Sequence, residues 1–179
     1  MPQPTAQPIK AFLSRSDIEA LEPVRHVHQH NANAIRFTRS LSHLAGLETL
    51  GLHLVNLTQG HFSTEYHSHH EDEEFIYILS GGGIARVGNT HQAVSQGDFM
   101  GFKTHSDAHS LYNPNPEDLV YLMGGTRCAI DICDYPDLDL RQFRVHGDRM
   151  AVQREHLQAA NPQTDRAVRP ADFEQKPDE

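Results

Sequence analysis

The most informative part of the chain runs from Gly60 to Gly81 and reads GHFSTEYHSHHEDEEFIYILSG. His67 and His69 are two residues apart, so on an extended strand both imidazoles leave the same face. Glu74 begins the apolar run that follows, which reads as the next strand. Imidazole and carboxylate groups together suit Zn, Fe, Mn, Ni or Cu. The segment therefore predicts two neighbouring strands that bring ligands to one metal site.

A second segment, from Gly97 to Asn113, reads GDFMGFKTHSDAHSLYN. His109 lies at the start of its second apolar run, where another strand is expected to begin. If that strand lies beside the first two, His109 supplies a fourth ligand to the same site.

Short apolar runs separated by Gly, Asn and Pro surround these two segments. The runs cover residues 52–57, 75–79, 84–87, 92–94, 99–102, 109–113, 119–123 and 129–133. No part of this region has a helical pattern long enough for a βαβ crossover. About eight short, evenly spaced strands predict an antiparallel sandwich or barrel.

The first segment resembles the first motif of the cupin superfamily. The motif positions are occupied by Gly60, His67, His69, Glu74 and Gly81, with one extra residue between Gly60 and His67. A neighbouring carboxylate, Glu73, also follows the two histidines, but it would leave seven residues before Gly81. The spacing therefore favours Glu74 over Glu73.

The second segment resembles the second cupin motif at Gly97, Asp98, His109 and Asn113. It departs from that motif in the turn, where Lys103 and His105 replace the usual Pro and Gly and one residue is added before His109. The spacing from His109 to Asn113 is intact, so the ligand position survives while the shape of the turn is open.

The resemblance covers roughly residues 50–135 and implies an all-β fold, the double-stranded β-helix or jelly-roll barrel of the cupins. It implies that one divalent transition metal (Zn, Fe, Mn or Ni) is held by His67, His69, Glu74 and His109, with positions left open for water or substrate. A metal with open positions can polarise a substrate oxygen, acidify water or bind dioxygen.

The expected function is that of a metalloenzyme acting on a sugar, a sugar phosphate or an organic acid, as an isomerase or lyase or as a dioxygenase. Residues 120–125 and 134–137 are similar to small bacterial cupins that often carry the name of sugar-phosphate isomerases, which is a fold-level guide only. The alternative is a sensory or storage module that binds a small molecule without turnover.

Several other side chains are weaker candidates. We interpret His70 as a surface residue, and His26, His28 and His30 as a polar edge. His105 and Lys103 are interpreted as exposed turn residues, although either could contact a substrate. His53 and Tyr121 lie within strand runs, and strand phase leaves open which side they face.

The charge balance excludes some partners. The chain has 179 residues, with 24 acidic residues against 15 Lys and Arg, and a formal net charge of -9. Such a chain lacks the cationic surface that nucleic acid or anionic lipid requires, so neither is an expected partner. Its 14 histidines are the unusual feature, and a metal site accounts for three of them.

The remaining sequence suggests three parts: an N-terminal extension over 1–49, the barrel over 50–135 and a polar extension over 136–179. Met1 to Lys10 and Asn161 to Glu179 are expected to be loose. A short helix is predicted by the capping-box spacing of Ser16 and Glu19 and ends before Pro23, and a second helix is expected near 149–159.

Cysteine usage and apolar run length bear on location and assembly. Cys128 and Cys133, if on one strand, lie about 16 Å apart, beyond reach of a disulfide. Two unpaired thiols, with no signal-peptide pattern and no membrane span, predict a cytoplasmic protein. A homodimer is expected because small cupins commonly cover exposed sheet edges by pairing.

Overall fold

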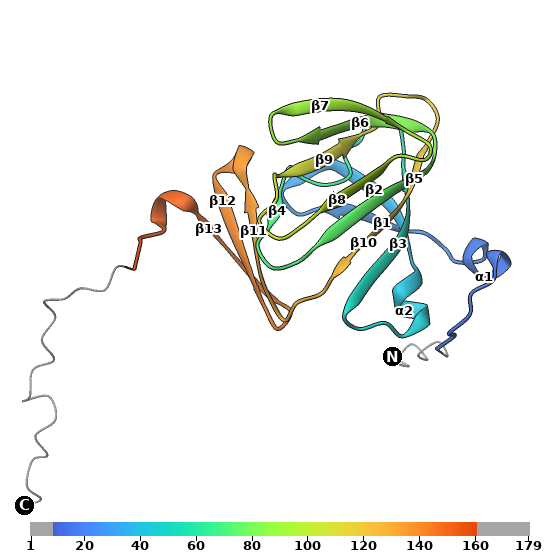
Figure 1. The fold of residues 1–179 in the computed structure, drawn as a ribbon, viewed down its shortest axis with the longest axis horizontal. Coiled ribbons are helices and arrows are strands. Elements are labelled where there is room, and N and C mark those ends of the chain that lie inside the picture. Colours follow the sequence, from blue (N-terminus) through green and yellow to red (C-terminus); the bar gives the residue numbers. More distant parts are fainter. Residues whose placement is uncertain (1–8, 161–179) are drawn as a thin grey trace, which may run out of the picture.

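Two antiparallel layers face each other in the computed structural model, which describes residues 9–160 (Figure 1). The first layer is a sheet of six strands in the order β1-β2-β3-β10-β5-β8. Its strands are β1 (Val24–His28), β2 (Asn31–Ser40), β3 (Leu50–Leu57), β10 (Leu119–Thr126), β5 (Glu74–Ser80) and β8 (Phe99–Phe102). Every neighbouring pair in this sheet is antiparallel.

The second layer consists of two shorter sheets that meet at the candidate ligands. One has the order β13-β12-β11-β4 and the other β7-β6-β9. The strands are β13 (Asp148–Gln153), β12 (Leu140–Val145), β11 (Ile130–Tyr135), β4 (Ser68–His69), β7 (Thr90–Ser95), β6 (Gly82–Val87) and β9 (His109–Tyr112). Backbone bridges between Phe62 and Tyr112 and between His67 and His109 join them into one layer. The expected jelly-roll barrel is confirmed.

The apolar core fills the space between the layers. Its residues alternate along each strand, as the two-residue period of a strand requires. The buried cluster comprises Val55, Leu57, Ile76, Ile78, Ala85, Val94, Phe102, Leu111, Leu119 and Tyr121. Burying a large aliphatic or aromatic side chain stabilises the fold by about 1.5–3 kcal/mol, so this cluster fixes which face of each strand points inward.

Gly81 closes the first motif at a turn that only glycine fits. Its φ is +75°, and an added Cβ would lie 2.3 Å from the Asp118 carbonyl oxygen. Glycine adopts this left-handed conformation without steric cost. The turn allows β5 to fold back directly into β6.

The predicted N-terminal helix exists, but a different residue caps it. Helix α1 covers Arg15–Glu19, and Ser14 is its N-cap. The Asp17 amide donates to Ser14 Oγ over 3.1 Å, and the Ser14 amide donates to the Asp17 carboxylate over 2.9 Å. The capping box expected at Ser16 and Glu19 is therefore wrong by two residues. A second short helix, α2 (Leu41–Ala45), follows β2 and was not predicted.

The helix expected at 149–159 is also wrong. Residues 148–153 form β13, which pairs with β12, and only the short 3₁₀ turn Arg154–His156 follows. His146 and Gly147 have φ of 49° and 94°. Two successive positive φ values suit a two-residue hairpin turn whose twist matches the strands. In Figure 1 this hairpin lies beside β11 at one side of the barrel.

All eight strand runs predicted from the sequence are present in the described residues, with ends shifted by up to three residues. The polar segments at 1–8 and 161–179 lie outside the described residues, so the loose ends remain a prediction. None of the helices within residues 9–160 is long and apolar enough to cross a membrane.

Candidate metal centre

Four side chains from three neighbouring strand segments converge at the candidate centre. His67 directly precedes β4 and His69 is its second residue. Glu74 is the first residue of β5, and His109 is the first residue of β9. The Glu74 carboxylate lies 3.2 Å from His109 Nε2, 3.6 Å from His67 Nε2 and 3.7 Å from His69 Nε2. The structure therefore brings together the four residues that the two sequence segments predict as ligands, and their role as ligands stays a prediction.

Backbone pairing explains why His67 and His109 meet. The His109 amide donates to the His67 carbonyl over 2.8 Å, and the His67 amide returns a bond of 3.2 Å. Their ring centroids are 4.7 Å apart. Directly paired residues present their side chains on the same face of a sheet, so the ladder itself sets the ligand geometry.

The hydrogen bonds of the imidazoles orient their free nitrogens toward Glu74. His67 Nδ1 lies 2.9 Å from the Glu65 carbonyl oxygen, and His69 Nδ1 lies 2.7 Å from Asp131 Oδ2. Because both partners are acceptors, each Nδ1 carries the proton, and a neutral ring then has a lone pair at Nε2. Two lone pairs facing a carboxylate repel unless a cation lies among them. The donor set therefore fits a divalent metal ion.

The pKa values of the ionisable groups in the cluster shift in different directions. Burial lowers the pKa of His69, but its hydrogen bond to Asp131 and the charge of Glu74 raise that pKa overall, so metal binding must displace a proton from this ring, whereas Glu74 and His109 already have the protonation states that a metal needs. Burial alone would raise the pKa of Glu74, but its hydrogen bond with His109 and the positive charge that His67 and His69 carry when protonated hold it well below its usual range. Burial lowers the pKa of His109 to about 4, against the opposing effect of Glu74. An ionised carboxylate beside a neutral imidazole is the protonation state that binds metal.

Asp131 supports His69 from β11. It is 3% exposed, and its second oxygen accepts the amides of Glu71 and Asp72 over 3.1 and 3.2 Å. A carboxylate that holds the far nitrogen of a ligating histidine fixes its tautomer and ring orientation. No local pattern points to Asp131, because it lies 62 residues from its partner.

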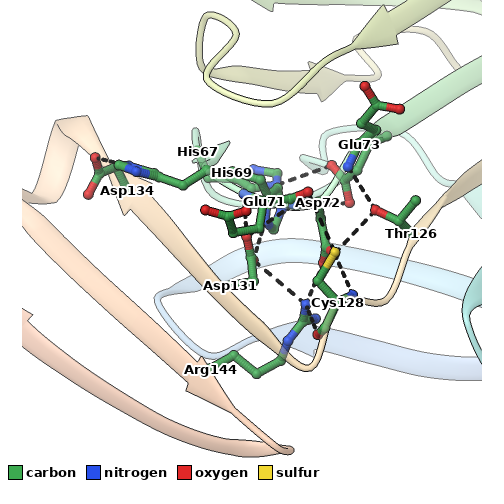
Figure 2. A network of polar contacts seen from close by, with 12 residues as sticks. His67, His69, Glu71, Asp72, Glu73, Thr126, Cys128, Asp131, Asp134 and Arg144 are labelled. Carbon is green, nitrogen blue, oxygen red and sulfur yellow. Dashed lines mark hydrogen bonds and ion pairs between the residues drawn. The ribbon is translucent and has the colours of Figure 1, made fainter.

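A second carboxylate, Asp72, connects this support to the C-terminal hairpin (Figure 2). Arg144 of β12 donates to Asp72 over 2.5 Å and to the Cys128 carbonyl over 3.1 Å, and lies 3.8 Å from Asp131. Asp72 also accepts the Cys128 amide over 2.8 Å. Arg144 therefore neutralises the two buried carboxylates that stand behind His69.

The centre opens into a cavity of about 370 Å³. Its lining includes His67, His69, Glu74, Asp131, Cys133, Tyr135 and Arg144 on the metal side. Its other residues include His26, His28, Arg36, Gly51, His53, Met123, Gly125 and Arg127. A cavity of this size suits a small polar molecule.

The weaker candidates divide between the cavity and the exterior. His26 and His28 of edge strand β1, and His53 of β3, line the cavity, so the interpretation of the β1 histidines as a mere polar edge is incomplete. Tyr121 is fully buried in the core, and burial raises its pKa to about 12. Its hydroxyl does not line the cavity.

The remaining candidates lie away from the cavity lining. Glu73 and Lys103 are exposed. His70 binds Asp134 over 3.0 Å and its ring centroid is 4.8 Å from that of His105. His105 has a φ of 55°, a conformation that favours glycine, in agreement with the glycine usual at this turn of the cupin motif.

Cys133 lies beside two of the candidate ligands. Both cysteines are free, as predicted, but Cys133 is buried, and its sulfur lies within 4.8 Å of the ligand nitrogens of His67 and His69. Burial raises the pKa of its thiol to about 12, so it stays protonated at neutral pH. The set of His67, Glu74 and His109 therefore remains the better group for a metal.

Comparisons with known proteins show which family and which solved structures share this architecture. The cupin domain family model matches residues 53–125. A protein from Acidithiobacillus ferrooxidans, provisionally named a sugar phosphate isomerase, is 36% identical, with a TM-score of 0.83 over 85% of this chain and 97% of that one. No curated protein matches the chain.

Two more distant structures share the fold. A sugar phosphate isomerase of the cupin superfamily from Silicibacter pomeroyi is 22% identical, with a TM-score of 0.71 over 81% of this chain and 94% of that one. A predicted oxalate decarboxylase from Thermotoga maritima is 19% identical, with a TM-score of 0.53 over 62% and 96%.

This chain has a jelly-roll barrel with histidines and a carboxylate beside its cavity, which is the architecture of the cupin-fold class of proteins. The close structural relative and the family match then show that this chain belongs to the cupin superfamily.

Proposed function

We propose that this chain is a metal-dependent cupin isomerase acting on a small phosphorylated sugar. The observation that carries the proposal is the convergence of His67, His69, Glu74 and His109, the first three of which line one cavity. The cavity volume of about 370 Å³ and the name of the Acidithiobacillus relative support a small phosphorylated sugar as the substrate.

In this proposal the four convergent side chains hold one divalent metal, which supplies polarisation of a substrate oxygen. Asp131 keeps His69 in the tautomer that leaves Nε2 free. Phe102 stacks on His109 with ring centroids 3.5 Å apart, which limits rotation of that imidazole. The protein thus presents a fixed ligand set.

His28 is an imidazole of the cavity wall. Burial, followed by the charges of His67 and Arg36, lowers its pKa to about 4. His28 is therefore neutral at pH 7, but so weakly basic an imidazole is a poor base toward a C–H bond, and we assign it to hydrogen bonding with the substrate. The proposed isomerisation moves no electrons to or from another molecule, so it needs no oxidant.

The test combines metal analysis with product formation. The full chain is loaded separately with Zn, Mn, Fe(II) and Ni, analysed for bound metal, and incubated with a panel of aldose and ketose phosphates followed by NMR. We expect stoichiometric metal and one interconverting pair, with both lost in Glu74→Gln and kept in Glu73→Gln. Absence of bound metal, or bound metal without turnover as in a binding module, would overturn the proposal.

A further inference from the structure

The half of the first sheet formed by β1, β2 and β3 carries a second cluster of charged side chains. Arg36 of β2, His53 of β3 and Arg127, directly after β10, all line the same cavity as the metal centre. Strand β10 separates this half of the sheet from β5 and Glu74. A cationic cluster here contrasts with the net charge of -9 of the whole chain.

Strand register shows that Arg36 and His53 point inward. Thr38 pairs with Val55 across β2 and β3, and both are buried. Arg36 and His53 each lie two residues before one of these, so they share the inward face. A guanidinium on the interior face of a barrel is costly unless something compensates its charge.

The two arginines contact only neutral oxygens. Arg36 donates to the Ser63 carbonyl, and Arg127 donates to Ser42 Oγ over 3.1 Å and to the Leu47 carbonyl over 3.3 Å. Within residues 9–160 neither has a carboxylate partner, in contrast to Arg144 with Asp72. Arg127 is exposed, so water compensates its charge, whereas the half-buried Arg36 has no counterion among the described residues.

Buried polar atoms at the wall also lack partners. Arg36 Nε and His53 Nδ1 are inaccessible to solvent and make no hydrogen bond among the described residues. Burial, followed by the charges of Arg127, Arg36 and His26, lowers the pKa of His53. Both arginines are therefore close enough for their positive charges to act on this imidazole. Arg36 Nε and His53 Nδ1 are closed to a ligand, so an incoming group with several acceptor oxygens would instead meet the guanidinium groups that line the cavity and compensate their charge.

We propose that Arg36, His53 and Arg127 form an anion-binding subsite that takes the phosphate group of the substrate. The assignment rests on the proposed function, since it divides one substrate between a metal that binds its sugar oxygens and a wall that binds its phosphate. Phosphate and carboxylate are both oxyanions, but two arginines match the nearly doubled charge of a phosphate ester better.

The test is calorimetric titration of the full, EDTA-treated chain with inorganic phosphate and, in a second arm, with acetate. Because EDTA removes bound metal, anion binding in this experiment measures only the subsite formed by Arg36, His53 and Arg127. We expect phosphate to bind more tightly than acetate, and Arg36→Gln and Arg127→Gln each to weaken phosphate binding by about 10-fold. Arg127→Lys, which keeps the charge, should retain part of the affinity and covers the case in which Arg127→Gln fails to fold.

Arg25→Gln is the matched control, since Arg25 is an exposed residue of β1 outside the cavity lining. An equal loss in this control, no loss in the Arg36 and Arg127 variants, no phosphate binding, or acetate binding as tight as phosphate would overturn the subsite. Phosphate binding at the wall without isomerisation would overturn only the proposed function, whereas turnover of unphosphorylated sugars without phosphate binding would overturn only the subsite.

Discussion

The cavity has a metal side, at His67, His69 and Glu74, and an arginine side, at Arg36, His53 and Arg127. The two sides differ in whether their polar groups have hydrogen-bond partners. On the metal side, His67 and His69 each have a fixed acceptor behind the ring, and Glu74 lies within 3.7 Å of three imidazoles. On the arginine side, Arg36 and His53 have buried nitrogens without partners. The metal side is arranged before any ligand arrives, whereas on the arginine side the charge of Arg36 has no counterion among the described residues and would gain one from an anionic ligand.

The two sides also differ in their origin in the chain. The metal side comes from residues 67–74 and 109, within the family match at 53–125. Arg36 and Arg127 lie outside that match and reach the cavity through strand pairing and the segment after β10. The family match therefore includes the candidate ligands of the metal side. Recognition of a particular substrate is expected to depend on the arginine side.

The largest expected effect is loss of metal in Glu74→Gln. The amide removes the negative charge on which three imidazoles converge, so metal affinity should fall by more than about 100-fold, beyond the loss typical of a supporting residue. Elemental analysis after dialysis measures this. Glu73→Gln, one residue earlier and exposed, should retain metal, and equal loss in both variants would break the distinction between the two carboxylates.

Asp131→Asn should weaken metal binding by about 10- to 100-fold, because the amide no longer enforces the His69 tautomer. Competition with a chromogenic chelator gives the affinity. The matched control is Asp134→Asn, which alters the carboxylate 3.0 Å from His70, an imidazole outside the cavity lining. A comparable loss in the Asp134 variant would mean that general loosening of β11 accounts for the effect.

Two glycines allow the two sides to be perturbed separately. An alanine at Gly125 would place its Cβ 2.6 Å from the Glu73 carbonyl and 3.0 Å from Glu74 Cγ, while one at Gly51 would meet Arg127 Nε at 3.3 Å. Gly125→Ala should therefore cost about 1–3 kcal/mol of stability and lower metal affinity.

Gly51→Ala should be milder, since a flexible side chain can move, and should affect phosphate binding more than metal binding. Thermal melts and the two binding assays compare them, and the reverse pattern would break the separation between the sides.

The smallest expected effect concerns pH. Burial, then the charges of Arg127, Arg36 and His26, lowers the pKa of His53 from 6.5. The unfolded chain then binds more protons than the folded one, so His53 reduces stability as pH falls below 6.5. His53→Asn should flatten this loss by less than about 1 kcal/mol between pH 7 and 5, judged by urea melts. An unchanged slope in His53→Asn would contradict this assignment.

Local spacing predicted the barrel strands and the four convergent residues because each signal lies within a few residues of its neighbours. The arginine side was missed because Arg36, His53 and Arg127 come from separate segments, and only register brings them to one face. Strand β2 (NANAIRFTRS) was missed because its inward positions are largely polar.

The helix expected at 149–159 failed for a different reason. The turn at His146 and Gly147 went unrecognised, and the following residues continue the ladder with β12. Asp131 was missed because its role depends on a contact across 62 residues. Contacts of this length are set by the fold and leave no local pattern.

The link from Arg144 to Asp72 and Asp131 has a consequence for the dynamics of the centre. A single guanidinium on the hairpin formed by β12 and β13 contacts both carboxylates behind His69, so detachment of that hairpin would leave Asp72 without its cationic partner and Asp131 with only its hydrogen bonds to His69 and two backbone amides. Opening of the hairpin and release of the metal should therefore belong to one cooperative unit. Strands β12 and β13 would then control how long the metal remains bound.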